Sequence, residues 1–429
     1  MQIRPTRNPL PLLSAAVALA LSGCNSDGQA SVAPTAPIAP TVPPVIEPPP
    51  PPPVITDDTQ ALQALLSAGG TIQLEARVYH TTAALIATVS GTTLRGAGPS
   101  TVIEFSPPPV GAARNPGVND RVIGSNSMAS TTQLPIARSI AKGDTSFEAS
   151  NAADAASLKP GDWVVVTVND PGVADENTHL GYPTYVDWAQ VSYVDGTTVH
   201  TVEPFRMAFP NALPFRANDS GLGFVRVKLL QNLTVEDLTI TVDAGAPAVG
   251  VYVLGTLGTT LKDVTINDPT SDAVYAEEAK GLSIVDCKLS GDKVLNEFSE
   301  SVDLTISGTT FSYDTVAIAL DLGTGFFSVT GNAIAHSGHV ALYAFYNVHD
   351  GTISNNIIDP ITNINNVGTI GLWLHGSPNI TMSGNTITGP GTTAIEAEGD
   401  PSAELLEPST GDVATGNIIS GFQNSVLIH

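Results

Sequence analysis

The chain has 429 residues, a formal net charge of −24 at pH 7 and only 17 Lys and Arg residues. This charge argues against a nucleic-acid partner, because nucleic-acid binding depends on Lys and Arg side chains that neutralise phosphates. It also argues against an acidic polysaccharide as ligand, unless a cation such as Ca²⁺ lies between the two anions.

Residues 1–23 have the composition of a signal peptide. Arg4 and Arg7 precede an apolar run that is shorter than the roughly 20 apolar residues needed to span a bilayer. The segment LSGC that follows resembles a bacterial lipobox, and this implies that Cys24 is lipidated and anchors the protein to a membrane. Asn25 after it implies the outer membrane, at the cell surface. The alternative is an ordinary secretion signal in which Cys24 stands by chance.

Residues 24–55 continue from this cysteine into a Pro-rich linker that ends in PPPPPP. Polyproline is stiff and extended, so the linker would hold a domain away from the membrane; a disordered spacer is the alternative. The other cysteine, Cys287, then has no disulfide partner and belongs to no cysteine metal site. The folded part therefore depends on a large core.

The folded part opens with DDTQALQALLSAGG, in which Asp57 or Asp58 caps a short helix. Its apolar residues are Leu62, Leu65 and Leu66, and the two glycines end it. The strands GGTIQL and GTTLRGAG follow. This stretch resembles the start of the pectate-lyase-superfamily β-helix, which implies a right-handed parallel β-helix but says little about chemistry. We expect residues 56–125 to form the N-terminal cap and the first coils.

Residues 126–225 read as a β-rich insertion. Two segments suggest β-hairpins, with turns at Gly143-Asp144 and Asp195-Gly196. We expect this section to pack against the β-helix and not to form a separate enzyme.

Residues 226–429 repeat in two-strand units. Equivalent positions recur 22 to 32 residues apart, at Leu238, Val264, Cys287, Thr309, Asn332, Asn356, Asn385 and Asn417. A period of this length in β-rich sequence indicates a parallel β-solenoid with one coil per repeat. The four asparagines predict a structural ladder at a turn, and Cys287 in the same position predicts a packed core thiol. The fold class is therefore all-β: a right-handed parallel β-helix with a short capping helix and an inserted β section.

A further strand in each repeat alternates between inward and outward side chains. The inward set is apolar: Val251, Val274, Val294, Ile318, Leu342, Leu372, Ile395 and Val426. Asn296 breaks the second inward set, so the register of residues 293–297 is the least constrained. One outward set is Tyr252, Tyr275, Leu295, Ala319, Tyr343, Trp373, Glu396 and Leu427. The other is Leu254, Glu277, Glu297, Asp321, Phe345, His375, Glu398 and His429.

The acidic residues of this face suggest hydrolysis of a glycosidic bond. Carboxyl groups on adjacent coils would lie about 4.8 Å apart at the backbone, and those two coils apart about twice that. Retaining glycosidases need about 5–5.5 Å between carboxyls and inverting ones about 6.5–9.5 Å, so Glu277, Glu297 and Asp321 offer either geometry. Like charges would raise the pKa of one member, as a general acid requires, and His375 would shuttle a proton.

Aromatic rings beside these acids predict polysaccharide as the partner, because rings stack on sugar faces. The candidate binding residues are Tyr252, Tyr275, Tyr343, Trp373 and Glu398. A non-catalytic glycan-binding or adhesive β-helix is the first alternative. Packing beneath the insertion, or contact within a homo-oligomer, would also use exposed aromatics, and the strand that ends at His429 leaves the last coil uncapped.

A polysaccharide lyase is the second alternative, with Ca²⁺ on the acidic face and a uronic substrate. Polygalacturonase-like relatives carry Gly-His-Gly and a late Arg-x-Lys; here Gly338-His339 is followed by Val340, and Arg226-Val227-Lys228 precedes the acidic face. The outward sets contain no Lys or Arg to act as a lyase base, although Arg206, Arg216, Arg226 or Lys228 could approach from a loop. His336, His339 and His349 have no metal-ligand spacing, so no metal or other cofactor is expected for hydrolysis.

Overall fold

A computed structural model describes residues 56–106, 121–125, 132–174, 181–216, 220–243, 248–267, 272–291, 296–313, 316–335, 340–359, 369–399 and 409–428. The chain divides into a unit of residues 1–56 and a unit of residues 57–429, and the fold described below belongs to the second. The predicted signal peptide, Cys24 and the linker lie outside the described residues.

The N-terminal helix forms as predicted. Helix α1 spans Thr59–Ala68, with Leu62 and Leu66 buried against the core, whereas Leu65 is exposed. Asp57 Oδ1 accepts a hydrogen bond from the first helical N–H at 2.9 Å, while the Asp58 carboxylate pairs with Arg77. Gly69, at φ 73°, ends the helix in a conformation that favours glycine.

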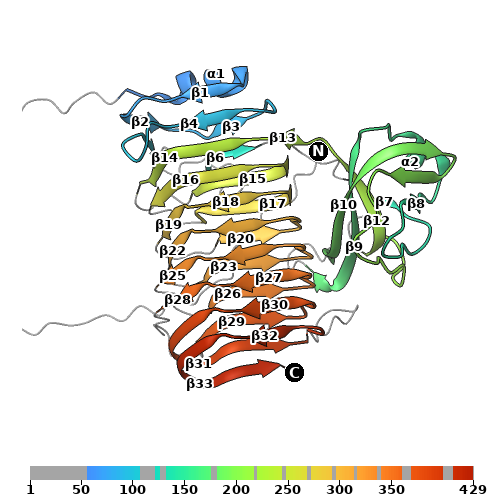
Figure 1. Cartoon of the computed structure of the whole chain (residues 1–429). Helices are drawn as coiled ribbons and strands as arrows, with labels where there is room; N and C mark the ends of the chain where they lie inside the picture. Colours follow the sequence, from blue (N-terminus) through green and yellow to red (C-terminus); the bar gives the residue numbers. More distant parts are fainter. Residues whose placement is uncertain are drawn as a thin grey trace, which may run out of the picture. The chain divides into compact units, whose positions relative to one another are not determined.

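Three parallel ladders run along the stacked coils (Figure 1). The first ladder is β1 (Thr71–Gln73), β4 (Thr93–Arg95), β14 (Thr234–Val242), β16 (Thr260–Asn267), β18 (Ser283–Val285), β21 (Thr305–Ser307), β24 (Ser328–Thr330), β27 (Gly351–Ser354), β30 (Ile380–Ser383) and β32 (Val413–Thr415). The second is β2 (Val78–Thr81), β5 (Val102–Phe105), β14, β16, β19 (Lys288–Gly291), β22 (Thr310–Tyr313), β25 (Ala333–Ala335), β28 (Ile357–Ile358), β31 (Thr386–Glu398) and β33 (Ile418–Ile428).

The third ladder carries the predicted functional face. It consists of β3 (Leu85–Ala87), β6 (Arg121–Ser125), β15 (Val249–Leu257), β17 (Val274–Lys280), β20 (Asn296–Ser299), β23 (Val316–Asp321), β26 (Val340–Phe345), β29 (Ile370–His375), β31 and β33. The short strand β13 (Leu230–Gln231) pairs with the end of β15.

The predicted asparagine ladder lies at the corner between the first and second ladders. Asn356 Oδ1 accepts hydrogen bonds from the backbone N–H and the amide of Asn332, both at 3.0 Å. The amide of Asn356 donates to the Val329 carbonyl, and the same pattern repeats at Asn385 with Asn417 as the next rung. The prediction of a structural ladder is confirmed.

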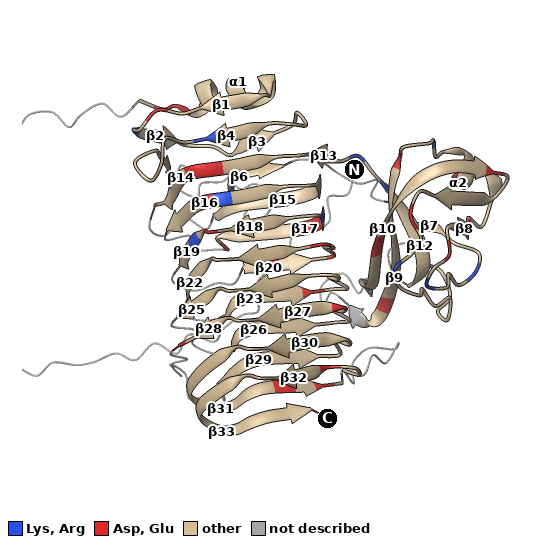
Figure 2. Cartoon of the chain, viewed as in Figure 1, with Lys and Arg blue, Asp and Glu red and all other residues tan. Residues whose placement is uncertain are grey.

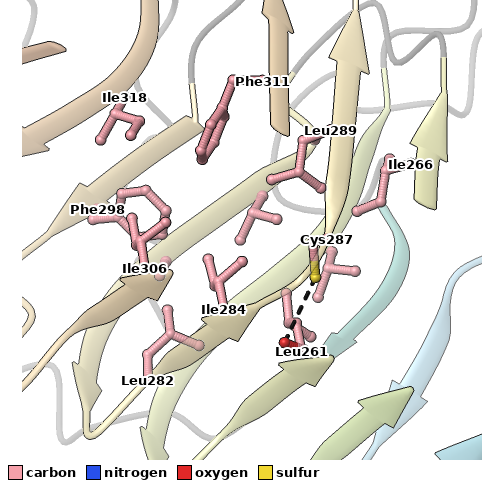
Figure 3. Packing of buried hydrophobic residues seen from close by; sticks show 14 of the residues in the cluster. Leu261, Ile266, Leu282, Ile284, Cys287, Leu289, Phe298, Ile306, Phe311 and Ile318 are labelled. Atoms are coloured by element: carbon pink, nitrogen blue, oxygen red, sulfur yellow. Dashed lines mark hydrogen bonds between the residues drawn. The ribbon is translucent and has the colours of Figure 1, made fainter. Parts of the chain in front are cut away.

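The space between the ladders is filled by apolar side chains (Figure 3). Cys287 is buried among them as a free thiol, with its Sγ 3.3 Å from the Val285 carbonyl and 3.6 Å from the Leu261 carbonyl. The prediction of a packed core thiol is therefore confirmed.

The inserted section forms its own six-stranded antiparallel sheet, together with the short helix α2 (Ala152–Ala156). The strand order is β7 (Leu134–Pro135), β12 (Gly221–Val227), β9 (Trp163–Ala174), β10 (Gly181–Asp195), β11 (Thr198–Thr201) and β8 (Ser146–Glu148). The predicted hairpin at Asp195-Gly196 joins β10 to β11. The segment Gly143-Asp144 makes a turn but no hairpin, because the strand after it, β8, pairs with β11.

The insertion packs on the corner that leads from the third ladder to the first. Val165, Val186 and Trp188 of the insertion form a cluster with Val302 of that corner. The amide of Asn347 donates to the Thr184 carbonyl at 2.7 Å. This contact confirms packing against the β-helix, at its corner.

No helix among the described residues is long and apolar enough to cross a membrane. The predicted fold class is confirmed, with a parallel β-helix, a short N-terminal helix and an inserted antiparallel sheet.

Candidate functional site

The outward side chains of the third ladder form two parallel rows, as predicted for most coils. Tyr252 is aligned with Tyr275, and Tyr343 with Trp373, whose next neighbour is Glu396. The inward leucines on either side of Trp373 are fully buried. The rows result from the two-residue period of a strand and the in-register stacking of coils.

The register of one coil differs from the prediction. Glu297 is aligned with Tyr275 and Ala319, not with Glu277 and Asp321. The residue between Glu277 and Asp321 is Ser299, whereas Leu295 lies outside the described residues. A two-residue slip keeps every side chain on its own face, which is why the alternation of apolar residues did not reveal it.

Asn296, which broke the predicted apolar pattern, takes the inward place aligned with Ile318. Its side chain is fully buried and satisfied: Oδ1 accepts from the Val274 N–H at 3.0 Å, and the amide donates to the Ala317 carbonyl at 2.8 Å. The Asn296 side chain is therefore hydrogen-bonded to the coil before it and to the coil after it.

The corrected register places three carboxylates around Ser299. Glu277 and Asp321 lie one strand to either side of it, about 9.6 Å apart at the backbone. Glu297 lies two residues before Ser299 on the same strand, roughly 8 Å diagonally from each of the other two acids. The Ser299 hydroxyl donates to Glu297 Oε1 at 2.9 Å. No two of these three acids are therefore aligned on adjacent coils, as the predicted register had placed them.

The side chains of this face are buried or half-buried and not openly exposed. Tyr252 and Asp321 are each only 8% exposed, and Ala319, on the outward side, is fully buried. The other described members of both rows are half-buried or buried. The backbone N–H of Leu322 donates to Asp321 Oδ1 at 2.8 Å, so this carboxylate is fixed at the strand end. Figure 2 shows acidic residues at the ends of β17 and β20, next to the corner that leads from the third ladder to the first.

One end of the face carries a tyrosine stack. The rings of Tyr252 and Tyr275 lie 5.1 Å apart at an interplanar angle of 23°. The Tyr252 hydroxyl donates to Glu277 Oε2 at 3.2 Å, and the Arg121 guanidinium lies 4.7 Å from the centroid of the same ring. Burial, followed by the nearby Glu277 carboxylate, raises the pKa of the Tyr252 phenol. The phenol is therefore a hydrogen-bond donor at neutral pH.

The other end carries an aromatic cluster centred on Phe345. Its ring contacts Tyr343 at 4.5 Å, Trp373 at 4.9 Å and His375 at 5.2 Å between centroids. The Trp373 indole donates to Glu398 Oε1 at 3.0 Å, and His375 Nδ1 lies 3.7 Å from the same oxygen. Glu398 therefore orients the Trp373 indole. The acidic residues around Ser299 lie between the tyrosine stack at one end of the face and the Phe345 cluster at the other.

Two residues near the face were not predicted. Asp272 precedes β17, is 7% exposed, and its Oδ1 has no hydrogen-bond partner among the described residues. Burial and then the Glu297 carboxylate raise the pKa of Asp272 well above its ordinary value. The sequence could have revealed Asp272, because it lies two residues before the inward Val274. The equivalent positions in two later coils are occupied by Val316 and Val340. Arg121 went unnoticed because it lies in the first coils, outside the repeats.

The described residues contain no group of three or more His, Cys, Asp or Glu side chains arranged to hold a metal ion. Of the basic residues considered for a lyase, Arg206 pairs with Asp187 and Asp303, and Arg226 pairs with Asp162. His336 and His339 lie outside the part of the chain that the structure describes.

A family model for a right-handed β-helix region matches residues 249–407. The fold is a right-handed parallel β-helix. This confirms, for the fold, the resemblance to the pectate-lyase superfamily. A search of curated proteins found no match.

Several solved structures are similar. The tailspike protein gp49 from Pseudomonas phage LKA1 is 14% identical, with 86% of this chain and 71% of that chain covered and a TM-score of 0.48. The tailspike gp61 of Pseudomonas phage phi297 is 15% identical, with 85% and 68% covered and a TM-score of 0.46. A hyperthermoactive exopolygalacturonase from Thermotoga maritima is 12% identical, with 87% and 86% covered and a TM-score of 0.43. Likenesses at this level do not bear on activity.

Proposed function

We propose that the protein acts on polysaccharide and cleaves glycosidic bonds by hydrolysis on the outward face of the third ladder. The observation that carries this proposal is the order of groups along the face: a tyrosine stack, then acidic residues around Ser299, then the Phe345 cluster. Aromatic rings bind sugar faces on both sides of the acids, so a chain laid along the coils would place a glycosidic bond among the carboxyls.

The scheme is hydrolysis with inversion, which requires about 6.5–9.5 Å between the two carboxyl groups so that a water molecule fits between them. Glu297 supplies one carboxyl and Asp321 or Glu277 the other; at the backbone each lies roughly 8 Å from Glu297. In this scheme one carboxylate removes a proton from the water as it attacks the anomeric carbon. A protonated carboxyl gives its proton to the leaving oxygen, so charge and protons balance.

Glu297 is the central residue of the scheme. Its Oε1 accepts the Ser299 hydroxyl, and its negative charge contributes to the raised pKa of Asp272. Acid–base hydrolysis requires one carboxyl that is protonated and one that is ionised. Glu277 and Asp321 are the candidate proton donors, and His375 remains a candidate proton shuttle.

The test is a screen of neutral and uronic polysaccharides for released reducing ends. We expect Glu297→Gln to lower the rate at least about 100-fold, and Asp321→Asn to lower it by a similar factor. Glu396→Gln, on the same row but among the aromatic residues, is the matched control and should retain most of the rate. Unchanged product release by both Glu297→Gln and Asp321→Asn would refute the assignment of the site.

A non-catalytic glycan-binding role is the second candidate, favoured by the aromatic cluster around Phe345. Such a protein would bind glycan through Trp373 and release no product. A lyase would instead give an unsaturated sugar that absorbs in the ultraviolet, and chelation of Ca²⁺ would abolish that signal. These three outcomes separate the three functions.

We also propose that the protein is a lipoprotein of the outer membrane, exported by residues 1–23 and acylated on Cys24. The support is the LSGC segment after an apolar run. Cells fed a labelled fatty acid should label the wild-type protein and not Cys24→Ala. Equal labelling of both would contradict the proposal.

A further inference from the structure

A pocket lies where the chain leaves the inserted sheet and returns to the coils. Its volume is about 490 Å³, within the range of about 300–1,000 Å³ typical of small-molecule sites. It is lined by Trp163 and the two residues before it, by the end of β12 and the two residues that follow, and by Gln231 of β13. No residue that lines it belongs to the two outward rows of the third ladder.

The pocket has an apolar wall. Trp163 is half-buried: it packs against the cluster of Val165, Trp188 and Val227, and it also lines the pocket. Leu229 does the same from the connecting segment. A partly exposed indole held on one side by a core is a platform on which the apolar face of a sugar ring can stack.

The rest of the lining is polar and carries both donors and acceptors. Arg226 Nε lies 3.1 Å from Asp162 Oδ2, and Arg226 Nη2 donates to Asp162 Oδ1 at 3.3 Å. The arginine side chain is 48% exposed and the aspartate 20%, so the pair retains groups for a ligand. Gln231 adds an amide. Sugar hydroxyls both donate and accept, which matches an Arg–Asp pair beside an amide.

The walls are fixed before any ligand arrives. Trp163 is aligned with Val227 across β9 and β12, and the Gly161 N–H donates to the Val191 carbonyl at 2.8 Å. The Gln231 N–H donates to the Ser90 hydroxyl at 3.0 Å. Strands of both sheets therefore hold the pocket, and preorganisation of this kind reduces the entropy lost on binding.

We propose that this pocket is an accessory glycan-binding site, which takes one pyranose residue stacked on Trp163 with its hydroxyls on the Arg226–Asp162 pair and Gln231. The ligand class rests on the proposed function, but the site does not depend on cleavage. A glycan held here would be tethered to the insertion, apart from the acidic residues around Ser299. The Arg226-Val227-Lys228 segment thereby gains a role in binding and none in catalysis.

The experiment measures saturation-transfer NMR and tryptophan fluorescence of the full-length protein with cellohexaose, xylohexaose and trigalacturonate at up to about 10 mM, which exceeds a Kd of about 1 mM. The titrations are made in a Trp373→Ala background, which removes the indole of the face proposed above to bind glycan, and we expect at least one probe to bind. Trp163→Ala should abolish that signal, Arg226→Met should weaken it about tenfold, and Gln231→Ala should weaken it by a smaller factor. Arg138→Met, which changes an exposed arginine of the insertion that does not line the pocket, is the matched control for Arg226→Met.

The outcomes are separable. Binding by only the neutral probes or only the uronic probe supports the site and assigns the sugar class. A signal that survives Trp163→Ala and Arg226→Met in the Trp373→Ala background, or disappears in Arg138→Met, overturns the proposal, as does the absence of any signal. If Trp163→Ala and Gln231→Ala still release product, then the proposed hydrolysis stands, whether or not the pocket binds glycan. If Trp163→Ala fails to fold, Arg226→Met and Gln231→Ala decide the question.

Discussion

Cys287 illustrates how the core governs the chemistry of one residue. The thiol is 1% exposed, and burial raises its pKa to about 11. A protonated thiol is a poor nucleophile, because the thiolate is the reactive form.

We therefore expect Cys287 to resist thiol reagents until the protein unfolds. In a Cys24→Ser variant, where Cys287 is the only cysteine, labelling with a chromogenic disulfide at mildly alkaline pH should be negligible without denaturant and complete in guanidinium. Full labelling within minutes in native buffer would show that the coils at Cys287 open readily.

Asp412 is a second residue whose surroundings determine its ionisation. Its Oδ1 accepts the Ile380 N–H at 2.7 Å, while Oδ2 has no hydrogen-bond partner among the described residues. Burial raises the pKa of Asp412 to about 6, against a small opposing effect of that hydrogen bond. A raised pKa in the folded state means that ionisation disfavours folding, so stability falls as the pH rises from about 4 to about 6.

Asp412→Asn should consequently be more stable than the wild type at pH 7 and of similar stability at pH 4. Asparagine keeps the acceptor for Ile380 but carries no charge. Because the site is partly open to solvent, we expect a gain of no more than about 1 kcal/mol. Urea unfolding at both pH values measures it, and a gain that is equal at the two pH values would contradict the role given to ionisation.

At the scale of elements, the asparagine ladder ties adjacent coils together at one corner. Asn356 is 1% exposed and accepts from two groups of Asn332 while donating to Val329. Asn356→Ala leaves several buried polar groups without partners, each costing about 1–3 kcal/mol.

We expect Asn356→Ala to lower the free energy of unfolding by about 3 kcal/mol or more. Asn417→Ala is the matched control, because Asn417 is half-buried and the same truncation there should cost less. Chemical denaturation followed by circular dichroism measures both. Equal losses in the two variants would mean that the burial of an asparagine does not determine how much it contributes to the free energy of unfolding.

The sequence predicted the elements better than their exact alignment. The helix at residues 59–68, the ladder of asparagines and the inward leucines around Trp373 follow from local signals: a cap, a repeat and a two-residue alternation. The register at Glu297 depends instead on how many residues the preceding connection takes up. Alternation cannot report this, since Asn296 and Phe298 face the core in either alignment.

The same limit applies to the candidate site. The aromatic and acidic composition of the face was visible in the repeats, whereas Asp272 and Arg121 come from a strand entrance and an early coil. Their approach to Glu297 and Tyr252 depends on how the coils stack. Exposure was overestimated because large side chains on neighbouring coils cover one another, as the Tyr252–Tyr275 stack does.

At the scale of the whole described fold, Arg206 joins the inserted sheet to the β-helix. Its guanidinium donates to Asp187 at 2.6 Å and to Asp303, and it lies 3.8 Å from the centroid of the Phe326 ring. Lys280 also donates to Asp303. Burial acts to raise the pKa of Asp303, but Lys280 and Arg206 outweigh it and hold this pKa below its ordinary value of 3.8.

This network should make the docking of the insertion sensitive to acid and to the loss of Arg206. A lowered folded pKa gives stability that is present above the ordinary value and is lost as the pH falls through the folded pKa, so the loss belongs below about pH 4. At neutral pH, Arg206→Met should cost about 3 kcal/mol, since the buried Asp187 carboxylate would lose its cationic partner and keep only backbone N–H donors.

Arg138→Met is the matched control, because Arg138 pairs with Glu148 at 3.3 Å with a side chain that is 71% exposed. Such exposed pairs contribute about 0–1 kcal/mol. Limited proteolysis should cut the insertion of Arg206→Met faster than that of the wild type or Arg138→Met, while the coils stay intact. If Arg206→Met is as stable and as resistant to protease as the control, then the apolar cluster around Val302 alone docks the insertion, and the ion pairs contribute nothing measurable.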